Sequence, residues 1–337
     1  MVKPMDKFIN GLMKTDTFQG FAGKTEIIQT HISMVFLTDQ FAYKIKKPVD
    51  FGFLDFSTLE KRRYYCNQEV KLNRRFSKDI YIQVLPILYD GKDYKVGEGR
   101  GEVVEYAVKM NRIPEKLIMK SEFETGRLTK NHLSDVAETL VNFHQTADWS
   151  PEIERFGEPD IFKITTDENF EQTERYIDVT LDRECFSTIR HWTNDFFQKN
   201  RDLFYERIRD RKIRDCHGDL HMEHILLSRP VSMFDCIEFN DRFRYTDTFA
   251  DVGFLLMDLE FHGGNESADI LWNLYSKKTM EDGLEHLMTF YKVYRAYVRG
   301  KVNSFQINDT NIPTYDKEKA IKTAQSYFHL ALSYVRQ

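Results

Sequence analysis

The hydrophobic pattern of this chain changes its period near residues 111–114, and this change limits the folds that the chain can adopt. Before it, apolar and polar residues alternate over 25–49, 80–89 and 102–110, as they do in half-buried strands. After it, apolar residues recur every three to four positions, as in helices, for example at Leu133, Val136, Leu140 and Phe143. The chain is therefore expected to have an α+β fold with a strand-rich first part and a mainly helical second part.

The order of the expected elements narrows this further. Ser57 and Glu60 form a capping box, which predicts that a helix starts between the third and fourth strands. The helical part is interrupted once, by a short strand-like hairpin at 224–237. We expect a protein-kinase-like bilobal fold. Residues 1–111 would form a lobe with a five-stranded antiparallel sheet and one helix, and residues 112–337 a helical lobe reached through a hinge at 111–114.

Charge and composition exclude several functional classes. The chain of 337 residues has 48 Lys and Arg against 53 Asp and Glu, and a net charge of −5 does not favour a nucleic-acid partner. No apolar run approaches the ~18 residues that a membrane span needs, and the first residues lack the apolar stretch of a signal peptide. The four cysteines form no CxxC pair, which suits a reduced thiol state. We expect a cytoplasmic protein without a membrane partner.

The densest polar cluster of the chain permits two kinds of site. In one, Asp219 orients or deprotonates a hydroxyl and Asp235 holds Mg²⁺, as phosphoryl transfer requires. In the other, a transition metal of a hydrolase is bound by His217, His221 and His224. The zinc signature HExxH is absent and HMEH is one residue shorter than HxxEH, so the first interpretation is preferred.

The segment HGDLHMEHILL, followed by DCIEFN, resembles the catalytic segment of the aminoglycoside phosphotransferase-like family, which includes choline and other small-molecule kinases. The family pattern is His-Gly-Asp-hydrophobic-His-x-x-Asn followed by a strand that ends in Asp. The similarity is greatest to a bacterial branch with His at the Asn position, and it extends over about residues 30–303. The resemblance implies that the γ-phosphoryl group of ATP, with Mg²⁺ as cofactor, is transferred to a hydroxyl of a small-molecule acceptor.

The resemblance also implies roles for residues of this segment. Asp219 matches the catalytic base and Asp235 the Mg²⁺-binding aspartate, while His224 stands where a second metal-binding Asn is expected. Imidazole nitrogen is a poorer ligand for Mg²⁺ than an amide oxygen. Therefore either His224 binds the metal weakly, or Glu238 supplies the missing oxygen, or one Mg²⁺ alone is held tightly. Glu238 could equally be the ion-pair partner of an arginine.

A kinase also needs a strand lysine that contacts the phosphates and pairs with a glutamate on the next helix. Lys44 lies in the sequence FAYK, which has the register of the V-A-I-K signature, and strand alternation puts Ala42, Lys44 and Lys46 on one face. Lys44 is the first choice for the phosphate lysine and Lys46 the second. Glu69 is the expected partner, with a solvated glutamate beside Arg62 as the alternative.

Other candidate residues follow from the positions that they occupy. The turn between the first two strands would cover the phosphates without a glycine, through Thr30, His31 and Ser33. The adenine would bond to the backbone around Met110, Asn111 and Ile113. The resemblance implies that Asp251 braces the catalytic loop, and bracing is also the preferred role of His217 and His221.

The acceptor is not determined by the sequence. Arg295 and Arg299 share a face of one helix and would favour an acceptor with a carboxylate or phosphate. The preferred alternative is that they pair with Glu238, Asp258 or Glu260, because unpaired arginines in a helical core are costly. The acidic helical part would instead suit a cationic acceptor. His224 and the glycine-free turn also permit a catalytically weak, pseudokinase-like nucleotide-binding protein.

Overall fold

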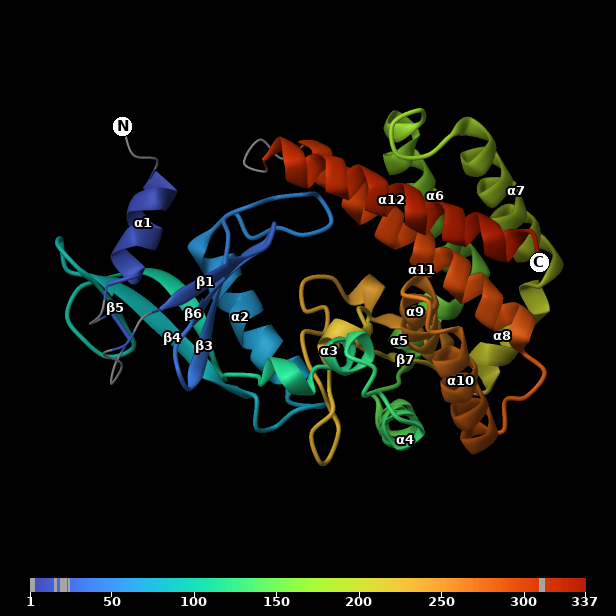
Figure 1. The fold of residues 1–337 in the computed structure, drawn as a ribbon, viewed down its shortest axis with the longest axis horizontal. Coiled ribbons are helices and arrows are strands. Elements are labelled where there is room, and N and C mark those ends of the chain that lie inside the picture. The colour runs from blue at the N-terminus through green and yellow to red at the C-terminus, as the bar shows by residue number, and fades with distance from the viewer. Residues whose placement is uncertain (1–3, 15–16, 19–22, 24, 309–312) are drawn as a thin grey trace. The chain divides into compact units, whose positions relative to one another are not determined.

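The computed structural model describes residues 4–14, 17–18, 23, 25–308 and 313–337. The chain forms two compact units (Figure 1). The first unit contains residues 1–122 and 224–241, and the second contains residues 123–223 and 242–337. The strand-rich part ends at Asn111, as expected. The first compact unit nevertheless extends beyond the predicted hinge and includes the hairpin from the middle of the helical part.

The first unit is built on an antiparallel sheet with the strand order β1-β2-β3-β6-β4-β5. Its strands are β1 (Glu26–Gln29), β2 (Ser33–Leu37), β3 (Phe41–Lys46), β4 (Tyr81–Tyr89), β5 (Tyr94–Val96) and β6 (Glu102–Asn111). The sheet has six strands where five were predicted. The additional strand, β5, lies in the segment that was interpreted as a turn, and it pairs with the end of β4.

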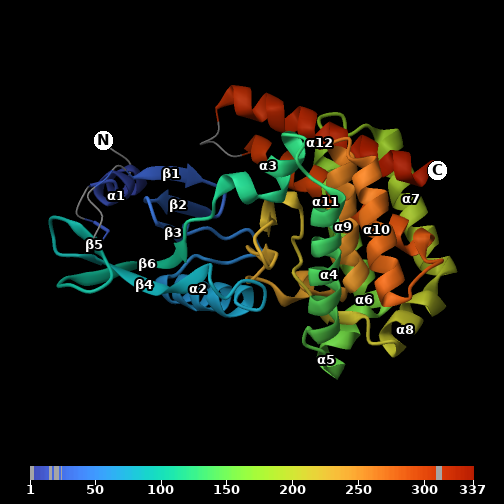
Figure 2. The same cartoon turned by 60° about the horizontal axis from the view of Figure 1, so that its bottom comes forward.

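Helix α2 (Leu59–Asn73) packs against β4 and β6 (Figure 2). It begins one residue later than the predicted capping box, because the side chain of Thr58 accepts the backbone N–H of Lys61. Ser57 instead donates to Asp55 at 2.6 Å. On this face of the sheet, Ala42 packs with Cys66 of α2 in a buried apolar cluster.

The opposite face of the sheet is covered in part by helix α1 (Pro4–Leu12). Tyr43 and Ile45 of β3 lie in the apolar cluster on this side, whereas Ala42 lies in the cluster on the α2 side. The predicted alternation along β3 is thus confirmed. It places both Lys44 and Lys46 on the same side as α2.

The hairpin of the first unit consists of β8 (Ile225–Leu226) and β9 (Ser232–Met233). The backbone N–H of Leu227 donates to the carbonyl of Leu117 at 2.8 Å, so the hairpin is held by the segment that follows β6. Asp235 comes directly after this hairpin, and its position in the unit therefore depends on a pairing between distant parts of the chain.

The second unit is mainly helical. Its helices are α3 (Met119–Glu124, which begins in the first unit), α4 (Lys130–Thr146), α5 (Pro151–Glu154), α6 (Pro159–Thr173), α7 (Arg183–Lys199), α8 (Arg201–Arg209), α9 (Thr248–Phe261), α10 (Asn265–Thr279), α11 (Glu285–Phe305) and α12 (Thr314–Val335). A short antiparallel pair joins β7 (Ile213–Asp215) to β10 (Tyr245–Asp247).

Helix α9 is the central helix of this unit. It contacts α10 and α11, and α11 in turn lies alongside α12 (Figure 1). Every residue from Thr248 to Leu259 is buried, including two aspartates. A helix that is enclosed in this way must satisfy its charged side chains internally. Within the part of the chain that the structure describes, no helix combines the length and apolar character needed to cross a membrane.

Candidate active site

The first unit contains a group of five charged residues, three of them buried and two partly exposed. This lysine–carboxylate cluster consists of Lys44, Lys46, Glu69, Asp235 and Glu238. The carboxylate of Glu69 bridges the two lysines, with Oε1 at 2.9 Å from Lys44 Nζ and Oε2 at 2.6 Å from Lys46 Nζ. Lys44 also pairs with Asp235, and Lys46 with Glu238. The structure thus brings together five of the residues that the sequence analysis selected.

Local structure explains how this cluster forms. Strand β3 presents both lysines toward α2, which carries Glu69. The segment after β9 supplies the other two carboxylates, and Asp235 has a φ of 60°, a conformation that is uncommon for a residue other than glycine. This backbone is held by side chains: the N–H of Asp235 donates to Tyr81 Oη and the N–H of Cys236 to Asn73 Oδ1, both at 2.9 Å.

The cluster has three carboxylates and two ammonium groups, and burial makes this imbalance costly. Burial opposes the charge of Lys44, but Asp235 and Glu69 outweigh it and raise the pKa of Lys44 well above its usual value. Burial also raises the pKa of Glu69, and there the two lysines outweigh it and lower the pKa. For Glu238, burial is stronger than the effect of Lys46, and the pKa is raised. The negative charge in excess therefore affects Glu238 more than Glu69.

The two lysines differ in their surroundings. Lys46 has a side chain that is 2% exposed, and its Nζ lies 4.8 Å from the centre of the Phe56 ring. Lys44 is 12% exposed and contacts Asp235, which is 37% exposed. Lys44 is thus more accessible from solvent than Lys46, and this difference favours Lys44 as the predicted phosphate lysine.

Two of the alternatives from the sequence are wrong. Glu69 is not a solvated glutamate beside Arg62, since it is fully buried between the lysines and Arg62 pairs with Glu105. Glu238 is an ion-pair partner, but its partner is Lys46 and not an arginine.

His224, in the position where a second metal ligand was expected, lies close to the predicted Mg²⁺ ligand. Its Nε2 is 3.8 Å from Oδ2 of Asp235, and its ring lies 5.8 Å from that of Phe234. The backbone carbonyl of His224 accepts the N–H of Phe234 at 3.1 Å, a bond next to the pairing of β8 with β9. The His224 ring is therefore close enough to interact with the carboxylate of Asp235.

The turn between β1 and β2 is closed by its own hydroxyl groups. Thr30 Oγ1 accepts the N–H of Ser33 at 3.0 Å, and the two hydroxyl oxygens are 2.9 Å apart. Lys47 Nζ donates to the carbonyl of Thr30 at 2.6 Å. His31, in the same turn, is partly buried. The turn is thus ordered by side chains, although it has no glycine.

The residues predicted to face the adenine lie at the end of β6. Met110 is buried on the α2 side, whereas Asn111 is exposed and its Nδ2 donates to the carbonyl of Asp79 at 2.5 Å. Ile113 packs against the same apolar cluster as Met110. Two of these three residues therefore belong to the apolar core on the α2 side.

In the second unit, residues 216–223 form a loop that follows β7 and is called here the 216–223 loop. Gly218 has a φ of 85°, which a side chain at this position would disfavour. The carboxylate of Asp251 accepts the N–H of His217 at 2.7 Å and that of Gly218 at 2.9 Å. Arg295 donates to the carbonyls of Gly218 at 2.8 Å and Ala250 at 3.0 Å. The backbone on the N-terminal side of Asp219 is therefore fixed by two buried side chains.

The side chain of Asp219 itself is 35% exposed. Its backbone N–H donates to His217 Nδ1 at 3.3 Å, and its Oδ2 lies 3.7 Å from Nε2 of His221. The His221 ring packs 5.5 Å from that of Phe254. A carboxylate that reaches solvent from a fixed backbone is suited to accept or orient a proton. His217 and His221 belong to this unit, whereas His224 belongs to the first.

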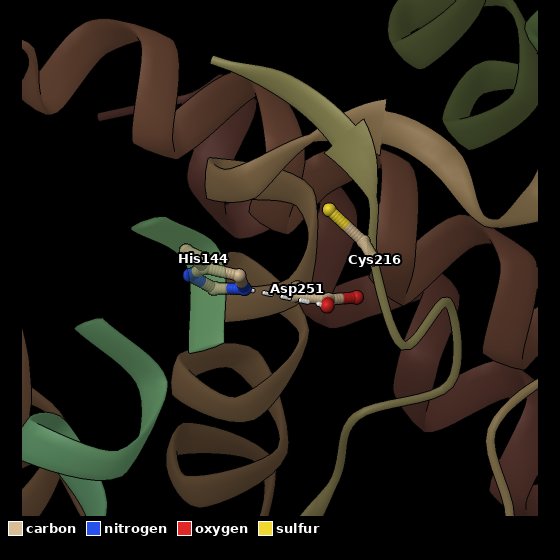
Figure 3. A group of neighbouring side chains, drawn as sticks. All are labelled: His144, Cys216 and Asp251. Atoms are coloured by element: carbon tan, nitrogen blue, oxygen red, sulfur yellow. Dashed lines mark hydrogen bonds and ion pairs between the residues drawn. The ribbon is translucent and has the colours of Figure 1, made fainter. Parts of the chain in front are cut away.

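His144 of α4 lies beside Asp251, and Cys216 is the third member of this buried group (Figure 3). His144 Nε2 is 3.5 Å from Asp251 Oδ2, while its Nδ1 is 2.9 Å from the hydroxyl of Tyr275. Burial alone would raise the pKa of Asp251, but the hydrogen bond and charge of His144, followed by the charges of His217 and Arg295, lower it to about 2. The carboxylate is thus kept ionised in the core.

Potential ligand atoms of His144, Cys216 and Asp251 lie within 4.8 Å of one another, a spacing that could suit a metal ion. Each group already has a protein partner, however. Both oxygens of Asp251 accept backbone N–H groups, and Cys216 Sγ donates to the carbonyl of Thr246 at 3.4 Å. A metal would have to displace these bonds, so the group is better explained as a brace of the 216–223 loop.

The two arginines of α11 have different partners. The preferred expectation that Arg295 pairs with Glu238, Asp258 or Glu260 is wrong, because its guanidinium donates to backbone carbonyls. Glu260 instead pairs with Lys292 at 2.8 Å. Arg299 lies over the ring of Tyr327, with Cζ 5.4 Å from the ring centre.

Several residues that position this site were not predicted from the sequence. His144 had a usable signal, because it follows Leu140 by four residues and so continues the apolar face of α4, where Phe143 was selected instead. Tyr81 and Asn73, which hold the segment of Asp235, gave no signal. Their bonds join parts of the chain more than 150 residues apart.

An antiparallel sheet with one packed helix and a buried Lys–Glu pair, together with a helical remainder, defines the protein-kinase-like class of folds. Residues 66–287 match the model of APH, the phosphotransferase enzyme family. This match spans more than half of the chain, and the chain belongs to this family. The predicted fold class and family are both confirmed.

The chain is also similar to individual known proteins. The chain is 31% identical over 278 residues to the uncharacterized proteins Rv2004c of Mycobacterium tuberculosis and Mb2027c of Mycobacterium bovis. The match covers 82% of this chain and 54% of each relative, so the chain spans about half the length of these proteins. The fold is also that of a choline/ethanolamine kinase family protein from Mesorhizobium loti, with a TM-score of 0.51, 13% identity and 94% of both chains covered.

Proposed function

We propose that the protein transfers the γ-phosphoryl group of MgATP to a hydroxyl of a small-molecule acceptor. The observation that carries this proposal is the buried Lys44–Glu69 ion pair beside Asp235, in a member of the APH family. Phosphoryl transfer depends mainly on charge neutralisation and alignment, which a lysine paired with a glutamate and a carboxylate that can hold a metal ion provide.

The donor set fits Mg²⁺. The cluster has one carboxylate more than it has lysines, which leaves one negative charge that a cation could balance. Asp235 would hold the ion with a partly exposed carboxylate, whereas Glu238 is sealed against Lys46. When bound, Mg²⁺ supplies positive charge that neutralises the phosphate oxygens. His224 offers nitrogen, which Mg²⁺ disfavours, and this supports a single tightly held ion.

The remaining roles follow from position and exposure. Lys44 would neutralise the phosphates, and Glu69 would orient it. Asp219 would accept or orient the proton of the acceptor hydroxyl, because it extends to solvent from a braced loop. Thr30, His31 and Ser33 would lie over the phosphates, with the adenine near the backbone of Met110, Asn111 and Ile113. Lys46 and Asp251 would maintain the charge balance and the loop backbone, respectively.

The test is a transfer assay with γ-labelled ATP, Mg²⁺ and pooled small hydroxyl compounds. We expect label in at least one pool with the wild type, and no label above background with Asp219→Asn. Asp269, an exposed residue of α10, provides the matched control Asp269→Asn, which should retain transfer. Binding of MgATP without transfer to any pool would contradict the proposal and favour a pseudokinase-like protein.

A further inference from the structure

Arg299 is partly buried and differs from the buried arginines of the second unit. The fully buried arginines of this unit all donate to fixed acceptors: Arg207 to Asp247 and Glu281, Arg244 to Asp215, and Arg295 to two carbonyls. Arg299 Nε is sealed from solvent and has no hydrogen-bond partner among the residues that the structure describes.

This Nε is also unusual among unsatisfied atoms. Over the described ranges, only two other buried side-chain polar atoms lack a hydrogen bond: Glu69 Oε1, which lies 2.9 Å from Lys44 Nζ, and Glu281 Oε2, which lies 3.2 Å from Lys212 Nζ. Each of these oxygens therefore has a cation beside it. Arg299 has no such ion pair. A buried donor without a partner is destabilising, and its presence indicates a missing acceptor.

The position of Arg299 places it on the same side of the unit as Asp219. Arg295 lies one helical turn earlier on the same face of α11 and binds the carbonyl of Gly218, the residue before Asp219. Burial would lower the pKa of Arg299, but the charge of Tyr327, followed by that of Asp219 and by a side-chain hydrogen bond with Tyr327, outweighs burial and raises the pKa. Asp258 is close as well, but its Oδ2 already accepts the N–H of Met222 at 2.9 Å.

The guanidinium is also held in one orientation. Its Cζ lies 5.4 Å from the centre of the Tyr327 ring, and this ring is stacked on Phe261 at 3.7 Å. Tyr327 belongs to α12, which lies alongside α11 (Figure 1). A planar, oriented fork of N–H donors suits an oxyanion such as a carboxylate or a phosphate.

We propose that Arg299 binds an anionic group of the acceptor, so that the substrates are small hydroxyl compounds bearing a carboxylate or a phosphate. This inference rests on the proposed function. It replaces the cationic acceptor that the acidic charge of the helical part would suit. Arg295, the other candidate for this role, is committed to backbone carbonyls and fixes the 216–223 loop.

The test runs the transfer assay on four separate pools of hydroxyl compounds: carboxylates, phosphate monoesters, neutral compounds and cationic amines. We expect the wild type to label mainly the carboxylate or the phosphate pool, and the pool that is labelled identifies the anion. For the best acceptor, kcat/KM is then compared with that of its neutral analogue, in which the acid is replaced by an alcohol or an amide.

Arg299→Gln should reduce kcat/KM for the anionic acceptor about 10- to 100-fold, the effect of one or two charge-assisted hydrogen bonds. It should also largely remove the preference over the neutral analogue. Arg299→Lys retains the charge but loses the planar fork of donors. Its kcat/KM for the anionic acceptor should lie between those of the wild type and Arg299→Gln. Arg183→Gln, at an exposed position of α7, is the matched control and should keep the wild-type preference.

Two results would overturn the inference while leaving the proposed function intact. One is preferential labelling of the neutral or cationic pool. The other is an equal loss for the anionic acceptor and its neutral analogue in Arg299→Gln and Arg299→Lys, with unchanged thermal melting. No label in any pool with the wild type would instead refute the proposed function, and the inference with it.

Discussion

The lysine–carboxylate cluster of the first unit and the 216–223 loop of the second hold their candidate functional residues by different physical means. In the cluster, side chains of opposite charge compensate one another, and one negative charge remains in excess. In the loop, charged side chains are satisfied by the backbone: Asp251 by N–H groups and Arg295 by carbonyls.

The cluster and the loop should therefore differ in how readily they rearrange. Ion pairs between side chains could exchange partners if phosphates and a metal ion bound as proposed, because no backbone bond would have to break. A loop whose N–H and carbonyl groups are bonded to buried side chains keeps its shape. We therefore expect the cluster to respond to the nucleotide and the loop to act as a rigid support for Asp219.

The largest predicted effect tests whether the cluster responds to the nucleotide while the loop only supports Asp219. Asp219→Asn should lower kcat about 10²- to 10⁴-fold, the usual contribution of a general base, and leave MgATP affinity close to that of the wild type. Lys44→Met should weaken MgATP binding as well as turnover. Turnover is measured by ADP release and affinity by calorimetry. Equal weakening of MgATP binding in Asp219→Asn and Lys44→Met would contradict this difference between the cluster and the loop.

The second prediction separates the two lysines of the cluster. Lys46→Met should destabilise the protein by about 3–5 kcal/mol, because it leaves buried carboxylates without a cation, whereas Lys44→Met should cost less. The double variant Lys46→Met/Glu238→Met should recover part of the loss, since both partners of one pair are then removed. Chemical denaturation measures these differences.

Lys71→Met, at an exposed site on α2, is the matched control for the lysine variants and should change stability by no more than about 0.5 kcal/mol. A stability loss in Lys44→Met as large as that in Lys46→Met would show that the partly exposed lysine has the same structural role. The assignment of Lys44 to the phosphates would then have no support from stability.

The third prediction concerns Lys301 of α11, a buried lysine whose hydrogen-bond partners are neutral amide oxygens. Its Nζ donates to Asn169 Oδ1 at 2.6 Å and Gln172 Oε1 at 3.0 Å, and burial lowers its pKa to about 8. The unfolded chain, with a pKa of about 10.4, binds more protons between these values. Unfolding free energy should therefore rise from pH 8 to pH 10.5, by about 3 kcal/mol in total.

This rise in stability should be absent from Lys301→Met, so the difference between variant and wild type must change with pH. The measurement is urea denaturation of both proteins at pH 7, 8, 9 and 10. Parallel pH profiles would show that the ammonium of Lys301 is better compensated than its two amide partners imply.

The smallest predicted effect addresses the brace. His144→Phe removes the contact with Asp251 and the bond to Tyr275, and it should cost about 1–2 kcal/mol, as expected for one buried hydrogen bond. It should lower kcat modestly through the position of Asp219, with little change in MgATP affinity. His191→Phe, at an exposed position on α7, is the control. An unchanged melting temperature and kcat would exclude His144 from the brace.

Much of the first unit could be predicted from the sequence. Strand alternation placed Ala42, Lys44 and Lys46 on one face, and the pattern of apolar residues on the next helix left Glu69 as an expected partner. The short strand β5 was missed, because a strand of three residues amid glycines and charges has too little pattern to be distinguished from a turn.

The partners of charged residues were predicted less well. Glu238 was expected to bind a metal or an arginine and is paired with Lys46, and Arg295 was expected to bind a carboxylate and binds carbonyls. A sequence shows which residues carry charge, but the choice among several partners depends on distances that tertiary packing sets. Backbone carbonyls in particular leave no trace in a sequence pattern.

The sequence alone determined the period change near residue 111, the motif with Asp219 and Asp235, and the strand that carries two lysines, because these depend on neighbours within a few residues. Tertiary structure alone decided that Lys46 is sealed while Lys44 remains accessible, and that Arg295 is bonded while Arg299 Nε is not. Burial and hydrogen bonding arise from residues distant in the chain, and a local pattern cannot report which of two similar side chains they satisfy.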